Sequence, residues 1–106
     1  MKSFDIFIAY MSWGNAGKSR PVLVFTLGDN IVDIYQITTK YEDKSAVVRA
    51  QYFKIEDWQQ AGLNIQSYVD TGTLITLPIN IFKDKAPIGK LTDADKQRLF
   101  NFLNNL

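Results

Sequence analysis

Short runs of hydrophobic and β-branched residues dominate the first part of the chain and predict β-strands. Residues 4–11 are aromatic and β-branched, a composition typical of a strand. Residues 22–25 form a continuous apolar run, which indicates a strand buried on both faces. The turn signal Gly-Asp-Asn at residues 28–30 precedes a further strand over residues 31–39, so these two strands are expected to form a hairpin.

The rest of the chain predicts further strands separated by polar segments. Residues 12–19 are rich in glycine and polar side chains, and they predict a long loop. Residues 46–53 alternate in character and predict a strand, and the threonine-rich residues 73–78 predict another.

Two helices are expected. The first is a short helix near residues 55–61, because Glu56 and Asp57 suit a first helical turn and Gly62 suits the position after the last turn. The second is a C-terminal helix near residues 92–104, where Thr92 is a good N-cap. An apolar stripe at helical spacing supports the second helix: Leu99, Phe100, Leu103 and Leu106.

Many short strands, one short helix and one terminal helix predict a mostly β protein, a small SH3-like β-barrel. A parallel α/β sheet is not expected, because crossover helices between the strands are missing. A chain of 106 residues with 46% hydrophobic residues is long enough for one packed domain and leaves no room for a second core.

Composition narrows the possible chemistry. The chain has no cysteine and no histidine, which excludes a disulfide framework, a thiolate zinc site and every catalytic scheme based on histidine. No carboxylate cluster has the spacing of metal ligands, so no metal ion and no cofactor are expected. The net charge of +1 argues against nucleic-acid binding through overall charge. No apolar run is long enough to span a membrane, so a cytoplasmic protein without a membrane partner is expected.

Two segments are candidates for binding a phosphate. Residues 17–21 read Gly-Lys-Ser-Arg-Pro, which places two cations directly before the buried strand. The spacing is not that of a Walker A motif, and a solvated loop explains the same residues. In residues 36–40, two hydroxyls and a lysine stand at the end of a strand, where threonine and lysine are also common for structural reasons. Trp13, in the polar loop, is a candidate for stacking on a nucleobase or for folding over the barrel.

Five segments, read in order, resemble the MazF/PemK family of toxins from bacterial toxin–antitoxin pairs. Residues 5–10 (DIFIAY) resemble the opening GDI strand of the family, and residues 18–24 (KSRPVLV) are similar to its RPVLV signature. Residues 37–40 (ITTK) match its ITS/ITA strand end, and residues 67–70 (SYVD) resemble its later S-V segment. Residues 88–95 (IGKLTDAD) look like its IGKLS entry into the final helix. Each motif is modest alone, but the ordered set spans nearly the whole chain.

The resemblance implies one MazF/PemK-like domain over residues 1–106, with an SH3-like barrel of the CcdB/MazF type. It also implies a homodimer that cleaves single-stranded messenger RNA at specific sequences without metal, leaving a 2′,3′-cyclic phosphate and a 5′-hydroxyl. Such a toxin inhibits growth, and a small acidic antitoxin keeps it inactive by lying across the RNA groove.

The resemblance also implies roles for individual residues. The catalytic arginine of the family corresponds to Arg20 and its catalytic threonine to Thr38. Phe4 stands where the family has an opening glycine, and the general base is not identified. The residues expected to contact RNA are Trp13, Gly17, Lys18, Ser19, Thr39, Lys40, Asp70 and Thr71.

Two other functions are compatible with a barrel of this kind. One is a non-enzymatic CcdB-like toxin that poisons DNA gyrase through a C-terminal helical tail. The other is an SH3-like module that binds a peptide in an aromatic groove, to which Trp13 and Tyr10 would contribute. Residues 101–106 are apolar on one face, which favours core packing over an active tail.

Overall fold

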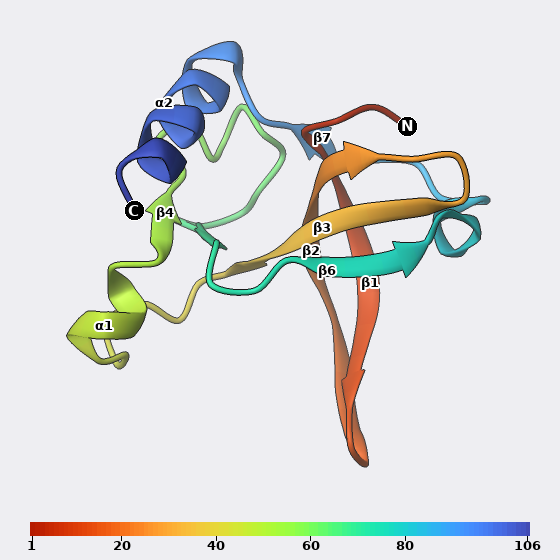
Figure 1. The fold of residues 1–106 in the computed structure, drawn as a ribbon, viewed down its shortest axis with the longest axis horizontal. Helices are drawn as coiled ribbons and strands as arrows, with labels where there is room; N and C mark the ends of the chain where they lie inside the picture. Colours follow the sequence, from red (N-terminus) through yellow and green to blue (C-terminus); the bar gives the residue numbers. More distant parts are fainter.

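The fold is a strongly curled antiparallel sheet with one helix packed at its end (Figure 1). The computed structural model describes the backbone of residues 1–106 and every side chain except that of Trp13. The strands are β1 (Asp5–Trp13), β2 (Ala16–Leu27), β3 (Ile31–Thr38), β4 (Tyr52–Lys54), β5 (Tyr68–Asp70), β6 (Ile75–Pro78) and β7 (Gly89–Lys90). The helices are α1 (Ala46–Arg49), the 3₁₀-helix η1 (Ile79–Phe82) and α2 (Asp93–Asn104). The prediction of a mostly β protein with a C-terminal helix is confirmed.

The order of the strands is β4-β5-β3-β2-β1-β7, and β6 pairs with β3 beside this path. The second edge of β3 is shared, because its first half pairs with β6 and its last two residues pair with β5. A register shift between Val24 and Thr26 interrupts the β2–β3 ladder, and such irregularities increase the local twist of a sheet. None of the helices in the described chain is both long and apolar enough to cross a membrane.

The sheet is buried on both faces at its centre. Val22, Leu23 and Val24 are fully buried, which confirms the prediction made from this apolar run. Leu23 belongs to the core cluster that α2 covers through Leu99, whereas Val22 and Val24 belong to a second cluster on the opposite face. Alternate residues of one strand therefore support two separate cores.

The prediction of a long loop over residues 12–19 is wrong. Strand β1 continues to Trp13 and pairs there with Ala16, so the connection is the two-residue turn Gly14–Asn15. Gly14 has φ +57°, and a tight hairpin of this kind needs a positive φ that glycine adopts at little cost. The polar residues of this segment lie on a long hairpin that projects from the sheet (Figure 1, red and orange).

The prediction of a strand over residues 46–53 is also largely wrong. Ser45 caps the four-residue helix α1 by accepting a hydrogen bond from the backbone N–H of Val48 at 3.3 Å. Only Tyr52 and Phe53 of the expected strand belong to β4. A short alternating run does not distinguish a strand from a single helical turn, and the serine cap favours the turn.

The short helix expected near residues 55–61 is not formed, and this segment is a series of turns. The backbone N–H groups of Glu56 and Asp57 donate to the carboxylate of Asp95 on α2, at 3.3 and 2.8 Å. This contact with another element sets the conformation of the segment instead of a continuous helical ladder. Gly62, which was expected to follow the last helical turn, has φ +90°, a left-handed conformation that glycine adopts at little cost.

Helix α2 begins as predicted, with the Thr92 hydroxyl accepting from the backbone N–H of Asp95 at 3.1 Å. The predicted apolar stripe is only partly correct. Leu99 is fully buried and Leu103 packs against the core, but Phe100 and Leu106 are exposed. Phe102 takes their place against the core, because the core lies on a slightly rotated face of the helix.

Phe4 has φ +73° and is the one non-glycine residue with a positive φ among the described residues. This conformation is costly for a side chain with a Cβ atom. The ring of Phe4 packs edge-to-face on Phe25 and Phe100, with centroid distances of 6.0 and 5.5 Å. These contacts hold the residue in a conformation that glycine adopts more easily.

Candidate functional site

The candidate site lies where β2 and β3 separate. The β2–β3 ladder ends at the pair Val22–Gln36. The residue before Val22 in the chain is Pro21, which has no backbone N–H to donate to the neighbouring strand. From this point towards its N-terminal end, β2 stays paired with β1, and towards its C-terminal end β3 pairs with β5. Continuing the β2–β3 register by two residues sets Arg20 opposite Thr38.

The same register aligns side chains on one face of the sheet. Successive residues of a strand point to opposite faces, so Arg20, Gln36 and Thr38 share a face. Strand β5 extends this face, because Tyr68 is the direct partner of Thr38 and Asp70 lies two residues further on. Tyr52 of β4 is in turn the direct partner of Asp70.

These residues surround a pocket of about 320 Å³. Arg20 and Thr38 both line it, although they come from different strands and are far apart in the sequence. The described residues that line the pocket are Lys18, Ser19, Arg20, Pro21, Gln36, Ile37, Thr38, Thr39, Lys40, Lys44, Tyr52 and Asp70. Four of them are cations and one is a carboxylate, so the local charge is strongly positive although the whole chain is nearly neutral. A pocket of this kind attracts anions.

Hydrogen bonds orient the two central side chains. The half-buried Arg20 donates from Nη1 to Oε1 of Gln36 at 3.0 Å, which limits the rotation of the guanidinium. The Thr38 hydroxyl oxygen accepts from the backbone N–H of Lys40 at 3.0 Å. This bond uses the hydroxyl as an acceptor, so its proton remains available to donate to a bound group.

The opposite side of the pocket carries a tyrosine and a carboxylate. Burial raises the pKa of Tyr52 above its usual value, the nearby Asp70 and Asp43 raise it further, and Arg20 acts in the opposite direction. The phenol is therefore protonated at neutral pH. Asp70 accepts from the backbone N–H of Gly72 at 2.9 Å, and this bond orders the turn that follows β5.

The structure gathers most of the residues that the sequence singled out. Besides Arg20 and Thr38, the pocket contains five of the residues expected to contact RNA: Lys18, Ser19, Thr39, Lys40 and Asp70. Gly17 and Thr71 are not among the lining residues. Gly17 lies against the hydroxyl end of the Tyr10 side chain, and Thr71 donates its hydroxyl proton to the carbonyl of Gln51. The side chain of Trp13 is outside the described part of the structure.

Two polar residues of the pocket, Lys44 and Tyr52, were not singled out from the sequence, and Gln36 was named only as part of the candidate segment 36–40, without a role of its own. The period of two along β3 already placed Gln36 on the face of Thr38 and was sufficient to find it. Tyr52 and Lys44 carried no such signal, because their positions depend on strand pairing and on the loop before α1. Among the described side chains, no group of three carboxylates is arranged to hold a metal ion.

Fold and pocket together define a class of small proteins with a curled antiparallel sheet, a C-terminal helix and a cationic pocket at the point where two strands diverge. No protein-family model and no curated protein matches the sequence. Among solved structures, the chain is similar to the Mycobacterium tuberculosis toxin MazF-mt6, with a TM-score of 0.69 and 25% sequence identity. The match covers 95% of this chain and 93% of that protein. The structure is MazF-like, which confirms the family resemblance predicted from the sequence motifs.

Proposed function

We propose that this chain is the toxin of a toxin–antitoxin pair and an endoribonuclease that cuts single-stranded RNA in the pocket between Arg20 and Thr38. The observation that carries the proposal is the convergence of an oriented guanidinium and a hydroxyl in one cationic pocket. The similarity to a MazF toxin over nearly the whole chain supports the same function.

The residues of the pocket suit transfer of a phosphoryl group within RNA. The ribose 2′-hydroxyl loses its proton to water as its oxygen attacks the adjacent phosphorus and forms a 2′,3′-cyclic phosphate. The bond to the 5′-oxygen of the next nucleotide breaks, and this oxygen takes up a proton from water to become a 5′-hydroxyl. Negative charge increases on the phosphate oxygens in the transition state, and the planar guanidinium of Arg20 is well shaped to stabilise it. Arg20 does not act as the base, because arginine keeps its proton in proteins.

The neighbouring groups have distinct roles in this proposal. Gln36 positions Arg20 through the hydrogen bond at 3.0 Å. The Thr38 hydroxyl donates to a phosphate oxygen and holds the phosphodiester in register. Lys18, Lys40 and Lys44 attract the flanking phosphates. Residues 1–106 act as a single MazF/PemK-like domain in a cytoplasmic homodimer, and a small acidic antitoxin complements the positive charge of the pocket.

A cleavage assay in EDTA tests the proposal. Purified protein is incubated with a long single-stranded RNA, and the new ends are mapped by their reactivity toward a polynucleotide kinase and a phosphatase. We expect 5′-hydroxyl and 2′,3′-cyclic phosphate ends. Arg20→Ala should lower the cleavage rate about 100- to 1000-fold, as does loss of one oxyanion donor.

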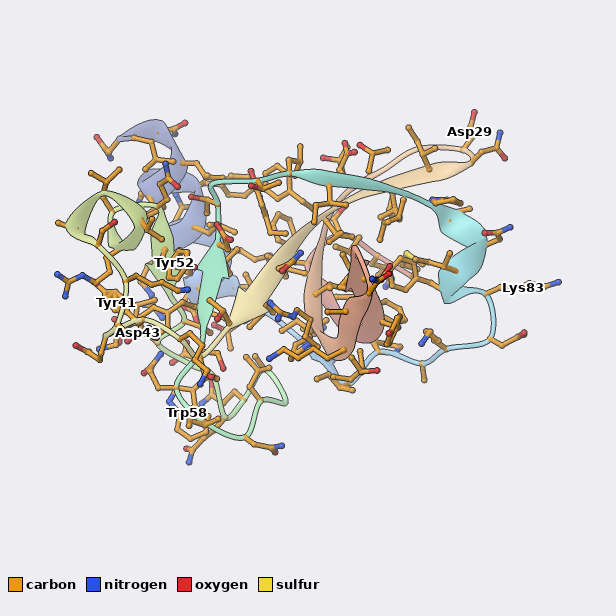
Figure 2. The ribbon with its side chains drawn as sticks, turned by 90° about the horizontal axis from the view of Figure 1, so that it is seen from below. Asp29, Tyr41, Asp43, Tyr52, Trp58 and Lys83 are labelled. Carbon is orange, nitrogen blue, oxygen red and sulfur yellow. The ribbon has the colours of Figure 1, made fainter. Side chains whose placement is uncertain are left out.

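The control must be a cation whose removal leaves the fold intact. Lys83 is suitable, because it is exposed and lies at the far end of the molecule from Tyr52 (Figure 2). Arg98 is not suitable, since its guanidinium pairs with the buried carboxylate of Asp95 at 3.0 Å. Equal activity of Arg20→Ala and Lys83→Ala would refute the assignment of Arg20. Intact RNA with inhibition of DNA gyrase would favour the gyrase-poisoning alternative, and the absence of both effects would favour a peptide-binding module.

Two further variants separate the positioning of Arg20 from direct contact with the phosphate. Gln36→Leu keeps the guanidinium but removes its hydrogen-bond acceptor, so we expect a loss of roughly 10-fold in cleavage rate. Thr38→Val keeps the shape of the side chain but removes the donor, and a loss of roughly 100-fold is expected. Combining Gln36→Leu with Arg20→Ala should cause no further loss, because the glutamine acts through the arginine.

A further inference from the structure

An aromatic cluster adjoins the cationic pocket. It consists of Tyr41, Tyr52 and Tyr68, which come from the loop after β3, from β4 and from β5. The rings of Tyr41 and Tyr68 are stacked, with centroids 4.4 Å apart and an angle of 25° between the planes. The rings of Tyr41 and Tyr52 are 6.3 Å apart and tilted by 56°. Tyr41 and Tyr52 lie side by side at one end of the molecule (Figure 2).

The sheet register places two of these rings on the face that carries Arg20. Tyr68 is the direct strand partner of Thr38, and Tyr52 is the direct partner of Asp70. Tyr52 is the aromatic side chain among the described residues that line the pocket, and it is half-buried, so part of its surface is open to a ligand. The guanidinium of Arg49 lies 5.8 Å from the centre of the Tyr41 ring and supports the cluster from α1.

We infer that Tyr52, supported by Tyr41 and Tyr68, forms a stacking subsite for a nucleobase next to the phosphate bound at Arg20. This inference rests on the proposed binding of RNA in the pocket, and it adds a site for a base to a site for a phosphate. In a nucleic acid, a nucleobase and its phosphate are joined by one ribose. A strand whose phosphate is bound at Arg20 therefore brings the neighbouring base within reach of Tyr52.

The chemistry of the cluster suits a nucleobase. Aromatic rings stack on the π-faces of all four bases, and adjacent cations bind the phosphates on either side. The Tyr52 ring is neutral at neutral pH, so it does not repel a phosphate as an ionised phenolate would. The Tyr52 ring packs against Tyr41, which itself stacks on Tyr68, and this packing orders the Tyr52 ring in advance and lowers the entropy lost on binding.

A binding assay with uncleavable strands tests the subsite. The probes are two fluorescent single strands of DNA of equal length, one of mixed sequence and one in which every nucleotide is abasic. Neither has a 2′-hydroxyl, so the proposed cleavage does not occur, and both carry the same phosphates. We expect the wild-type protein to bind the strand with bases roughly 10-fold more tightly than the abasic strand.

Variants then assign the preference to Tyr52. Tyr52→Leu should bring the ratio of the two affinities close to one, because the strand with bases loses more affinity than the abasic strand, whereas Tyr52→Phe should keep the ratio. The control is Tyr10→Leu, because Tyr10 is 64% exposed and lies on the opposite face of the β1–β2 pair from Arg20. Circular dichroism checks that each variant is folded, and the wild-type ratio tests the inference without any variant.

Three results would overturn the inference. They are an equal affinity of the wild-type protein for both strands, an unchanged ratio of affinities in Tyr52→Leu, and an equal loss of affinity for both strands in Tyr52→Leu. Failure of the proposed function is a separate result. RNA that stays intact while the base preference depends on Tyr52 would refute cleavage and keep the subsite. RNA that is cut by a protein without a base preference would refute the subsite alone.

Discussion

Replacing Asp95 by alanine tests how α2 is fixed to the rest of the fold. The carboxylate of Asp95 is fully buried and accepts from the backbone N–H groups of Glu56 and Asp57 at 3.3 and 2.8 Å. It also accepts from Nε of Arg98 at 3.0 Å. Asp95→Ala therefore leaves two partly buried backbone N–H groups without their acceptor.

The size of the effect follows from these two groups. A buried donor that loses its partner costs about 1–3 kcal/mol, and these two donors are only partly buried, so the free energy of unfolding should fall by about 2–3 kcal/mol. Domains of this size are stable by only about 5–15 kcal/mol, so the loss is a large fraction of the total. Asp95→Asn keeps the volume and one acceptor oxygen, and it should cost about half as much.

Urea unfolding, followed by tryptophan fluorescence and circular dichroism, measures the change. Asp93→Ala is the matched control, because Asp93 lies in the same helical turn but its side chain is 99% exposed and pairs only with Lys96 on the surface. It should have no measurable effect. If Asp95→Ala and Asp93→Ala were equally stable, the network around Asp95 would not fix α2, and the explanation for residues 55–61 would be wrong.

Three other outcomes can be measured. Burial raises the pKa of Tyr35 and of Tyr52, so the folded state keeps these protons longer and the free energy of unfolding should fall as the pH rises above 10. Urea unfolding at several alkaline pH values should show a shallower fall in Tyr52→Phe, and an unchanged slope in that variant would contradict the linkage. Phe4→Gly should be about 1 kcal/mol more stable than Phe4→Ala, because alanine keeps the cost of the positive φ. Glycine usually makes a protein less stable than alanine does, and thermal unfolding of the two variants shows whether this order is reversed at residue 4. Gly89→Ala should cost about 2–3 kcal/mol, since a Cβ atom there would overlap the carbonyl oxygen of Ala61; an unchanged melting temperature would show that the two backbones separate easily.

The elements that could be predicted from the sequence are those whose signals are local. Thr92 caps its helix with its own hydroxyl, and the turn at residues 28–30 is closed by a bond between Gly28 and Ile31. Val22 to Val24 are apolar on both faces, and both faces are buried. In each case the residues that decide the structure are neighbours in the chain, so the pattern contains the necessary information.

The predictions that failed have different causes, and only for residues 55–61 is the deciding partner far away in the sequence. Residues 12–19 resemble a loop by composition, but the ladder between the ends of β1 and β2 pairs residues close in the chain, such as Ser12 with Gly17, and makes the segment a hairpin. Residues 55–61 have a helical composition, but Asp95 binds their first N–H groups from another element. Local propensity is weak compared with such contacts, so it does not decide these segments.

The residues of the candidate site also differ in how far a local sequence signal could identify them. Arg20 and Thr38 were singled out by family resemblance, because each local motif by itself also has an ordinary structural explanation. The structure places both in one pocket, and their catalytic roles remain a prediction. Tyr52 was missed, because its position beside Asp70 depends on the pairing of two short strands.

By itself, the sequence determined the type of chemistry that is possible and the fold class. The absence of histidine and cysteine limits any catalyst to arginine, lysine, carboxylates and hydroxyls, and the period-two patterns specify a β protein. Only the tertiary structure decided which of these side chains meet. A proline interrupts the β2–β3 ladder and the two strands separate, so the cations of one strand face the hydroxyl of the other across a pocket. Strand register is a long-range property, because it depends on pairing between residues distant in the chain, and no local pattern specifies it completely.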